Sequence, residues 1–265
     1  MRHDEMNDPD RWDRMIANYE EQADPFTRRF AEAAVARLPI GPDTRVLDIA
    51  TGVGAAAFAA AARGAQVLAT DFAPGLIARL AAKAGGTIET RVMDGQALAL
   101  PDAAFDVTMS MFGIMLFPDW RKGLLEMARV TRPGGTGVLG TWKHPAGAAT
   151  NLLLTEILCE RFPELELPAM PEGMGALRDP ARLARAMEAA GFETPDIIEV
   201  THDFELRLST FDDPDRILGL MPHWTMLTAD QKLEAVAEIR RRAAVSAVGD
   251  VLPIPSTALI AIARR

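Results

Sequence analysis

The stretch VLDIATGVGAAAFAAAARG, from Val46 to Gly64, has the pattern of a buried strand, a glycine-containing loop and an alanine-rich helix in direct succession. Gly52 and Gly54 let the backbone approach a ligand closely, and the first turn of the following helix offers free N–H groups. Asp48 lies inside the apolar strand, where a carboxylate is costly unless it has a partner. The stretch therefore predicts a ligand site at the end of a parallel strand, with an acid beside it.

Strands and helices alternate on the C-terminal side of this motif. Strands are expected at 45–49, 66–70, 88–92, 107–111 and 137–141, and the helices between them at 55–62, 74–83 and 120–131. Elements that alternate in this way form right-handed βαβ units. The sequence therefore predicts an α/β fold with a doubly wound, mostly parallel sheet, which binds its ligand at the carboxyl ends of the strands.

Four segments follow from the pattern along the whole chain. We expect an N-terminal helical lid over 1–42, a cofactor-binding core over 43–145, a mixture of cap helices and late strands over 146–252, and a final strand over 253–265. Within the third segment the pattern favours a strand pair at 197–208 and a helical stretch over 213–248. The turn Arg132-Pro133-Gly134-Gly135 is expected to end the preceding helix.

The composition is that of a soluble globular protein, with 49% hydrophobic and 25% charged residues. A net charge of −9 opposes a nucleic-acid partner, since such binding depends on clustered Lys and Arg. The single cysteine excludes an intramolecular disulfide, and no apolar run reaches the ~18 residues of a membrane span. We expect a cytoplasmic protein with no membrane span, and a homodimer is compatible with the sequence.

Two classes of cofactor compete for the glycine loop. Gly52, Gly54 and Ala57, with Asp71 as a ribose acid, also fit a dinucleotide fingerprint. Asp48, however, would place a negative charge beside the helix N-terminus that holds a pyrophosphate in that case. A zwitterion with a cationic amine and a sulfonium suits this acid better.

Two further acids follow strands of the core. Asp71 comes after QVLAT, where a carboxylate can accept both hydroxyls of a ribose, although an acid at the start of a helix is the structural alternative. Asp94 comes after the strand at 88–92 and can accept a hydrogen bond from an exocyclic amine, or else be an ordinary turn residue. Carboxyl ends of neighbouring parallel strands share one edge, so these acids are expected on the same side of the sheet as Asp48.

Four segments in this order resemble the class I S-adenosylmethionine-dependent methyltransferases. They are VLDIATGVG, ATDFAPGLIARL, MDGQALALPDAAFDV and LLEMARVTRPGGTGVL, which together span about Thr44 to Trp142. The resemblance is strongest to the small-molecule branch that includes the ubiquinone and menaquinone C-methyltransferases. It implies a seven-stranded Rossmann-like methyltransferase fold, S-adenosylmethionine as donor and S-adenosylhomocysteine as product.

The resemblance also implies roles for individual residues toward the donor. Asp48 would serve the methionine amine, while Asp71 would hold the ribose and Phe72 would cover one face of the adenine. Asp94 would meet the adenine amino group. The remaining members of the implied donor site are Ala50, Gly52 and Gly54 in the first loop, Gly95 and Gln96 after Asp94, and Ser110 and Met111 beneath the methionine.

The segment over 146–252 is larger than the sheet needs and is expected to shape an acceptor site. Seven residues of it would give an adaptable apolar pocket if they converge, or ordinary cap core if they do not. They are Met170, Met174, Phe211, Met221, Trp224, Met226 and Leu227. We expect a small, largely apolar acceptor, of a quinone-like, phenolic or natural-product kind.

Methyl transfer from a sulfonium is an in-line displacement, so alignment and exclusion of water supply much of the catalysis and no metal is needed. A base helps where the acceptor must lose a proton. The candidates are Tyr19 on an N-terminal helix, His144 just after the strand at 137–141, and His223 in the cap. Each also has a non-catalytic alternative: Tyr19 as a packing residue, His144 as a surface histidine and His223 as a solvent-facing or core histidine.

The sequence thus predicts a methyltransferase that acts on a small molecule. Two alternatives remain at this stage: a protein that binds S-adenosylmethionine but catalyses another reaction, such as a cyclisation or decarboxylation, and a non-catalytic cofactor sensor. A nicotinamide oxidoreductase is the weakest alternative.

Overall fold

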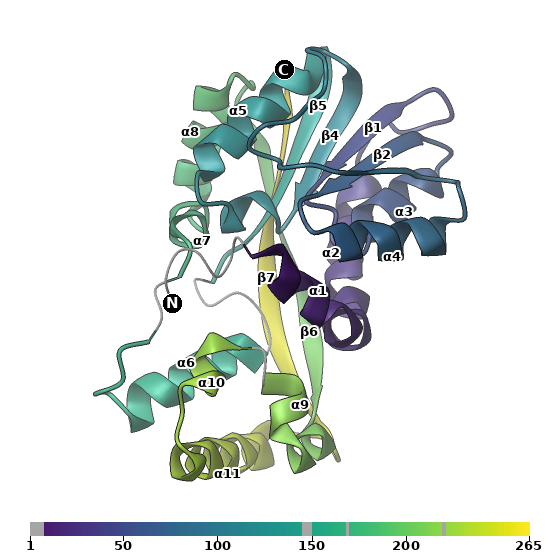
Figure 1. Cartoon of the computed structure of the whole chain (residues 1–265). Coiled ribbons are helices and arrows are strands. Elements are labelled where there is room, and N and C mark those ends of the chain that lie inside the picture. The colour runs from purple at the N-terminus through teal and green to yellow at the C-terminus, as the bar shows by residue number, and fades with distance from the viewer. Residues whose placement is uncertain (1–7, 145–149, 168–169, 219–220) are drawn as a thin grey trace.

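The computed structural model describes residues 8–144, 150–167, 170–218 and 221–265 and consists of one large sheet with helices on both faces (Figure 1). The strand order is β3-β2-β1-β4-β5-β7-β6, in which β7 is antiparallel to both of its neighbours. The strands are β1 (Arg45–Ile49), β2 (Gln66–Asp71), β3 (Glu89–Val92), β4 (Phe105–Met111), β5 (Thr131–Trp142), β6 (Asp196–Arg207) and β7 (Val251–Arg264). The predicted α/β fold is confirmed.

Side chains of β1 alternate between two hydrophobic cores, as expected for a strand covered on both faces. Val46 packs with one core and Leu47 and Ile49 with the other. The first core includes residues of α2 (Asp24–Val35), α3 (Ala55–Ala61) and α4 (Pro74–Ala84), and the second includes α5 (Trp120–Val130) and α8 (Pro180–Ala190). Asp48 is the one charged residue in this strand interior and is 1% exposed.

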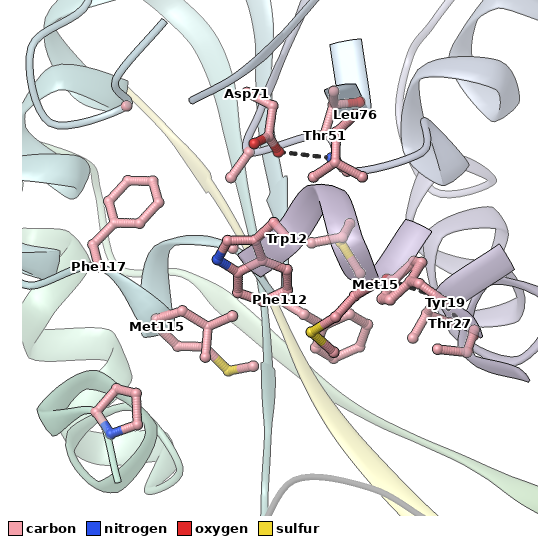
Figure 2. Close-up of a pocket in the computed structure, with 18 of the residues that line it drawn as sticks. Trp12, Met15, Tyr19, Thr27, Thr51, Asp71, Leu76, Phe112, Met115 and Phe117 are labelled. Carbon is pink, nitrogen blue, oxygen red and sulfur yellow. Dashed lines mark hydrogen bonds between the residues drawn. The ribbon is translucent and has the colours of Figure 1, made fainter. Parts of the chain in front are cut away.

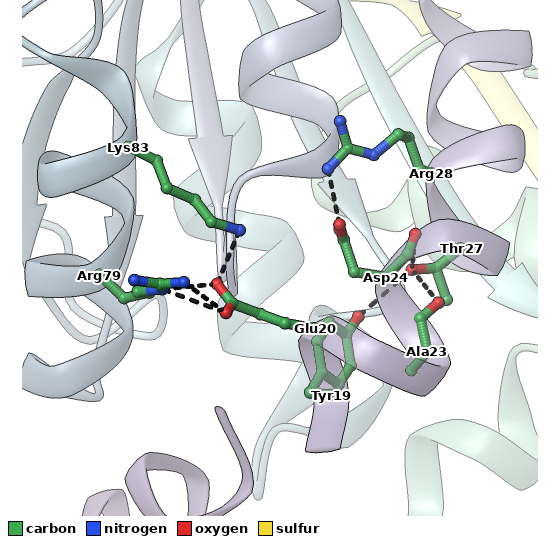
Figure 3. Close-up of polar contacts among 8 residues, drawn as sticks. All are labelled: Tyr19, Glu20, Ala23, Asp24, Thr27, Arg28, Arg79 and Lys83. Atoms are coloured by element: carbon green, nitrogen blue, oxygen red, sulfur yellow. Dashed lines mark hydrogen bonds and ion pairs between the residues drawn. The ribbon is translucent and has the colours of Figure 1, made fainter. Parts of the chain in front are cut away.

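The N-terminal segment is a helix with a π turn in its middle. The order is α1 (Pro9–Asn18), the π turn η2 (Tyr19–Ala23) and then α2. Pro25 has no N–H to continue an α-helical pattern, and the N–H of Asp24 donates instead to the carbonyl of Tyr19, five residues back. The glutamate Glu20 of this turn forms ion pairs with Arg79 and Lys83 of α4, which hold the segment against the core (Figure 3).

The strand pair expected at 197–208 is wrong, because β6 is a single strand. It pairs with β7 along its whole length, from Asp196 opposite Ile262 to Arg207 opposite Val251. The sequence IIEVTHDFELR contains no Gly, Pro or Asn that would turn the chain. Only Ala258–Arg264 of β7 pairs with β5, so the other half of the β6–β7 ribbon extends beyond the sheet.

The far half of this ribbon carries a separate helical cap. Its helices are α6 (Thr150–Arg161), α9 (Pro214–Leu218), α10 (Pro222–Thr225) and α11 (Ala229–Ser246), and α7 (Glu172–Ala176) precedes α8 on the core. Their buried side chains form one hydrophobic cluster with Leu206 of β6 and Leu252 of β7. The expected helical stretch over 213–248 is helical and divides into α9, α10 and α11, because Pro222 begins α10 and the Thr228 capping box begins α11.

Two shorter features complete the fold. Short 3-10 turns lie at Ile114–Leu116 (η3) and Leu208–Asp212 (η4). The turn Arg132-Pro133-Gly134-Gly135 does not simply end α5; it bulges out of the start of β5, where the register with β4 shifts. Gly134 has a φ of +73° there, and its N–H donates to the carbonyl of Arg265. No helix among the described residues is long and apolar enough to cross a membrane.

Candidate functional site

A cavity of about 720 Å³ lies at the carboxyl edge of the sheet, between the core, the N-terminal segment and the cap (Figure 2). The core contributes Asp48, Ala50, Thr51, Gly52, Ala55, Ala56, Asp71, Phe72, Leu76, Met93, Asp94, Gly95, Gln96, Met111, Phe112, Gly113, Met115, Leu116, Phe117, Pro118 and Trp142. The N-terminal segment contributes Arg11, Trp12, Met15, Tyr19, Ala23, Phe26, Thr27 and Ala31, and the remaining lining residues are Asn151, Met170, Pro171, Met174, Phe204, Met221 and His223. Most of the residues predicted for the donor thus meet in one place.

Asp48 finds its partners within the first loop and helix. Its Oδ2 accepts hydrogen bonds from the hydroxyl of Thr51 at 2.6 Å and from the backbone N–H of Ala57 at 3.0 Å. Burial nevertheless raises the pKa of this carboxyl to about 7. A cationic group in the cavity would stabilise the ionised form, which agrees with the proposed match to an amine.

This raised pKa predicts a pH-dependent stability. The unfolded chain releases the proton near 3.8, while the folded protein holds it up to about pH 7, so ionisation of Asp48 destabilises the fold as the pH rises. Relative to Asp48→Asn, the free energy of unfolding of the wild type should fall by up to about 4 kcal/mol between about pH 4 and about pH 8. Urea unfolding of both proteins at matched pH measures this, and a constant difference contradicts it.

Asp71 ties the glycine loop to β2. One carboxylate oxygen accepts from the N–H of Gly52 at 2.9 Å (Figure 2). The other accepts from the N–H of Ala73 at 3.1 Å. The side chain is buried, and this burial raises its pKa. Because the carboxylate lines the cavity and also holds two amides, it can position the loop and accept hydroxyl groups of a ligand with its remaining lone pairs.

The two glycines of the loop have different surroundings. Gly52 has a φ of +57° and lines the cavity, and an added Cβ would meet no atom within 4 Å. Gly54 has a φ of +97°, is absent from the lining residues described, and an added Cβ would overlap the side chain of Leu80. The space at Gly52 is therefore available to a ligand, whereas the space at Gly54 is used by the packing of α3 on α4.

Asp94, Gly95 and Gln96 line the cavity together. Asp94 is exposed, and its carboxylate accepts from both the backbone N–H and the side-chain amide of Gln96, at 2.9 and 3.1 Å. The side-chain carbonyl oxygen (Oε1) of Gln96 in turn accepts from the backbone N–H of Asp119. Gly95 packs closely, since an added Cβ would lie 2.6 Å from Phe117. The turn is thus preorganised and keeps polar atoms at the cavity wall.

The ends of β1 and β4 each carry a residue with an unusual backbone. Ala50 has a φ of +54° and Phe112 a φ of +64°, and both line the cavity. Met111 lines it as well. Ser110 does not: it is fully buried, and its hydroxyl accepts from the N–H of Ile114. Left-handed residues of this type are strained and are concentrated at binding sites.

The three candidate bases differ in their position relative to the cavity. His144 is exposed and is not among the described lining residues, so the structure does not bring it to the donor residues. Tyr19 lines the cavity, and its hydroxyl lies 3.4 Å from that of Thr27. His223 also lines the cavity, is 8% exposed, and its Nδ1 is buried without a hydrogen bond to a described residue. Burial lowers the pKa of His223, so the ring is neutral at neutral pH.

The seven apolar cap candidates lie in three environments. Met170, Met174 and Met221 line the cavity. Phe211, Trp224 and Leu227 belong to the cap core, and Met226 is 40% exposed. Their common apolar character could not distinguish these positions.

An aromatic wall was not predicted. The ring of Trp142 stacks on Phe112 with centroids 4.0 Å apart and lies nearly parallel to Phe26 at 6.2 Å. All three line the cavity, as do Trp12 and Met15 of α1. The sequence predicted that the N-terminal segment is helical, but nothing in it placed Phe112 or Trp142 against that segment.

Comparisons with known proteins agree with this geometry. Residues 47–139 match a family described as Methyltransferase domain. The chain is 37% identical over 180 residues to a demethylmenaquinone methyltransferase of Mycobacterium sp. (strain KMS), with 64% of this chain and 75% of that one covered.

Solved structures share the fold at lower identity. The YcgJ protein of Bacillus subtilis matches with a TM-score of 0.55 at 17% identity and covers 89% of this chain and 99% of that one. Phosphoethanolamine N-methyltransferase 2 of Haemonchus contortus, in complex with S-adenosyl-L-methionine, matches with a TM-score of 0.53 at 17% identity, with 89% and 52% covered. The chain belongs to the class I S-adenosylmethionine-dependent methyltransferases, resembles the demethylmenaquinone methyltransferases among them, and uses S-adenosylmethionine as its methyl donor.

Proposed function

We propose that the acceptor is a small, largely apolar molecule with an ionisable hydroxyl, such as a phenol or a quinol, and that His223 takes its proton. The observation that carries this proposal is the neutral, buried imidazole at the cavity wall, whose Nδ1 has no partner among the described residues. A buried unpaired nitrogen is costly unless a ligand satisfies it. The name of the Mycobacterium relative, a demethylmenaquinone methyltransferase, supports a quinol-like acceptor.

The lining residues fit the donor in charge and in space. Asp48, Asp71 and Asp94 give the core side of the cavity a negative character, which suits a sulfonium and an ammonium. The open space at Gly52 leaves room for the methionine moiety. We assign Phe72, Gly95 and Gln96 to the adenosine half and Ala50 and Met111 to the methionine half.

Bound S-adenosylmethionine supplies an electrophilic methyl group on a sulfonium. The chain's own part is to exclude water and align the acceptor, for which the aromatic wall and Met170, Met174 and Met221 provide apolar surface. His223 accepts the hydroxyl proton while the acceptor oxygen, or the ring carbon conjugated to it, gains the methyl group. The apolar surroundings favour an uncharged acceptor and a neutral histidine.

His223→Ala is expected to lower kcat about 100-fold or more, the size of a general-base contribution, and to change the Kd for S-adenosylhomocysteine less than about twofold. Transfer of labelled methyl from the donor to naphthohydroquinone and to simple phenols measures kcat, and calorimetry measures Kd. His144→Ala is the matched control, since that histidine is exposed and outside the cavity.

The outcome that contradicts the base assignment is a His223→Ala enzyme with the kcat of the wild type. The acceptor class is tested separately, by incubating wild-type protein with labelled donor and a cell extract. Label found solely in macromolecules would overturn the small-molecule acceptor.

A further inference from the structure

We infer that Tyr19 acts as a neutral hydrogen-bond acceptor that faces the sulfonium of the donor, because its own hydroxyl proton is committed to Thr27. The inference rests on the proposed seat of the donor at Asp48 and Asp71. It assigns Tyr19 to binding of the donor's charge, and not to proton abstraction.

The direction of the Tyr19 hydroxyl follows from a chain of hydrogen bonds. The Thr27 hydroxyl lies 3.1 Å from the carbonyl of Ala23 and 3.4 Å from that of Asp24, and a carbonyl can only accept (Figure 3). The single Thr27 proton therefore points at these carbonyls. In the 3.4 Å contact between the two hydroxyls, Tyr19 must then be the donor. Its lone pairs remain for a ligand in the cavity.

The position of Tyr19 matches the middle of the donor. Tyr19 lines the same cavity as Asp48 and Asp71, which are assigned to the methionine amine and to the ribose, and packs in one cluster with Val53 and Ala73 of the loops after β1 and β2. The sulfonium connects these two halves of the molecule. We therefore assign the Tyr19 phenol, which lines the cavity between the two loops, to the sulfur.

Tyr19 is also held in the neutral form. Burial raises the pKa of its hydroxyl, and the negative charges of Asp24, Asp71 and Asp48 raise it further, against the hydrogen bond with Thr27. A phenol in this environment is a poor base but keeps a dipole. Its oxygen carries a partial negative charge, and Tyr19 lines the cavity that is assigned to the cationic donor.

The π turn explains how the two hydroxyls meet. Tyr19 begins the turn and Thr27 lies in the first part of α2, eight residues later, which on a continuous α-helix would be about 12 Å along the axis. The π turn between them, in which the N–H of Asp24 donates to the carbonyl of Tyr19, departs from this regular α-helical spacing. The ring is fixed by packing in a cluster with Val53, Ala73 and Leu76.

Tyr19→Phe tests the inference without any acceptor. S-adenosylmethionine carries the sulfonium charge and S-adenosylhomocysteine does not. The variant should therefore raise the Kd for S-adenosylmethionine about tenfold and the Kd for S-adenosylhomocysteine about twofold or less. Titration calorimetry of the full chain with each ligand gives both values of Kd. Equal weakening of both ligands would show a packing role, and unchanged values would show no role; either result overturns the inference.

Thr27→Val provides the matched second variant. It removes the partner of the Tyr19 proton while the phenol stays, and should lower the preference for S-adenosylmethionine by about threefold. In the double variant, loss of Thr27 should add nothing to the effect of Tyr19→Phe, because both act through one oxygen. Additive losses would contradict the hydrogen-bond chain. Since neither measurement uses acceptor or His223, failure here is distinct from failure of the proposed reaction.

Discussion

Asp71→Ala is expected to weaken binding of S-adenosylhomocysteine at least about 100-fold, equivalent to about 3 kcal/mol. The change removes the acceptor for the amides of Gly52 and Ala73, so the glycine loop loses its attachment to β2. It also removes the group assigned to the ribose hydroxyls. Titration calorimetry measures the loss.

Asp94→Ala is the control for this result. Asp94 lines the same cavity but is exposed and bonds to Gln96 of its own turn, so its removal should weaken the same ligand less than about tenfold. If Asp71→Ala binds S-adenosylhomocysteine as the wild type does, Asp71 is not part of the donor site. If the two variants lose affinity equally, the proposal that Asp71 contributes more to donor binding than Asp94 is wrong.

The second large effect is a difference between substitutions at the two glycines of the loop, Gly52 and Gly54. Gly54→Ala should lower the free energy of unfolding by about 3 kcal/mol, from a left-handed φ and an overlap with Leu80. Gly52→Ala should cost only about 1 kcal/mol, because its Cβ enters open space. The second variant should instead lose donor affinity, since that space lies at the cavity wall.

Urea unfolding and calorimetry on the same two proteins measure this contrast. Gly52→Ala should remain folded with S-adenosylhomocysteine affinity reduced at least about tenfold. The reverse pattern, with Gly52→Ala the less stable protein and Gly54→Ala the one that fails to bind, would contradict the assignment.

The alternation of strands and helices in the core, and the meeting of Asp48, Asp71 and Asp94 at one edge of the sheet, could be predicted from the sequence because they depend on local patterns. The alternation of β1 between two cores and the turn chemistry after it require only neighbouring residues. The same is true of Asp71 and Asp94, which follow strands whose ends share one edge.

What could not be predicted depends on contacts between distant segments. His144 and His223 both follow apolar stretches of the sequence. His223 is buried because α10, which contains it, packs at the cavity, whereas His144 is exposed after β5. The single strand β6 was missed because the register with β7 joins residues about fifty positions apart. Gly54 was given a ligand role because its φ and its contact with Leu80 are invisible in a Gly-x-Gly pattern.

The β6–β7 ribbon limits how ligands can enter and leave. Its ladder runs without interruption from the donor-binding sheet into the floor of the cap, so the cap cannot swing away as a separate body without breaking backbone hydrogen bonds. The opposite wall is different, since α1 and the π turn meet α4 through side chains, including the Glu20 ion pairs. These ion pairs, and the packing of Trp12, Ile16 and Tyr19 on Leu76, join the two parts without a shared backbone ladder. We therefore expect the donor and its product to pass on the side of α1, while the ribbon keeps the cap in place.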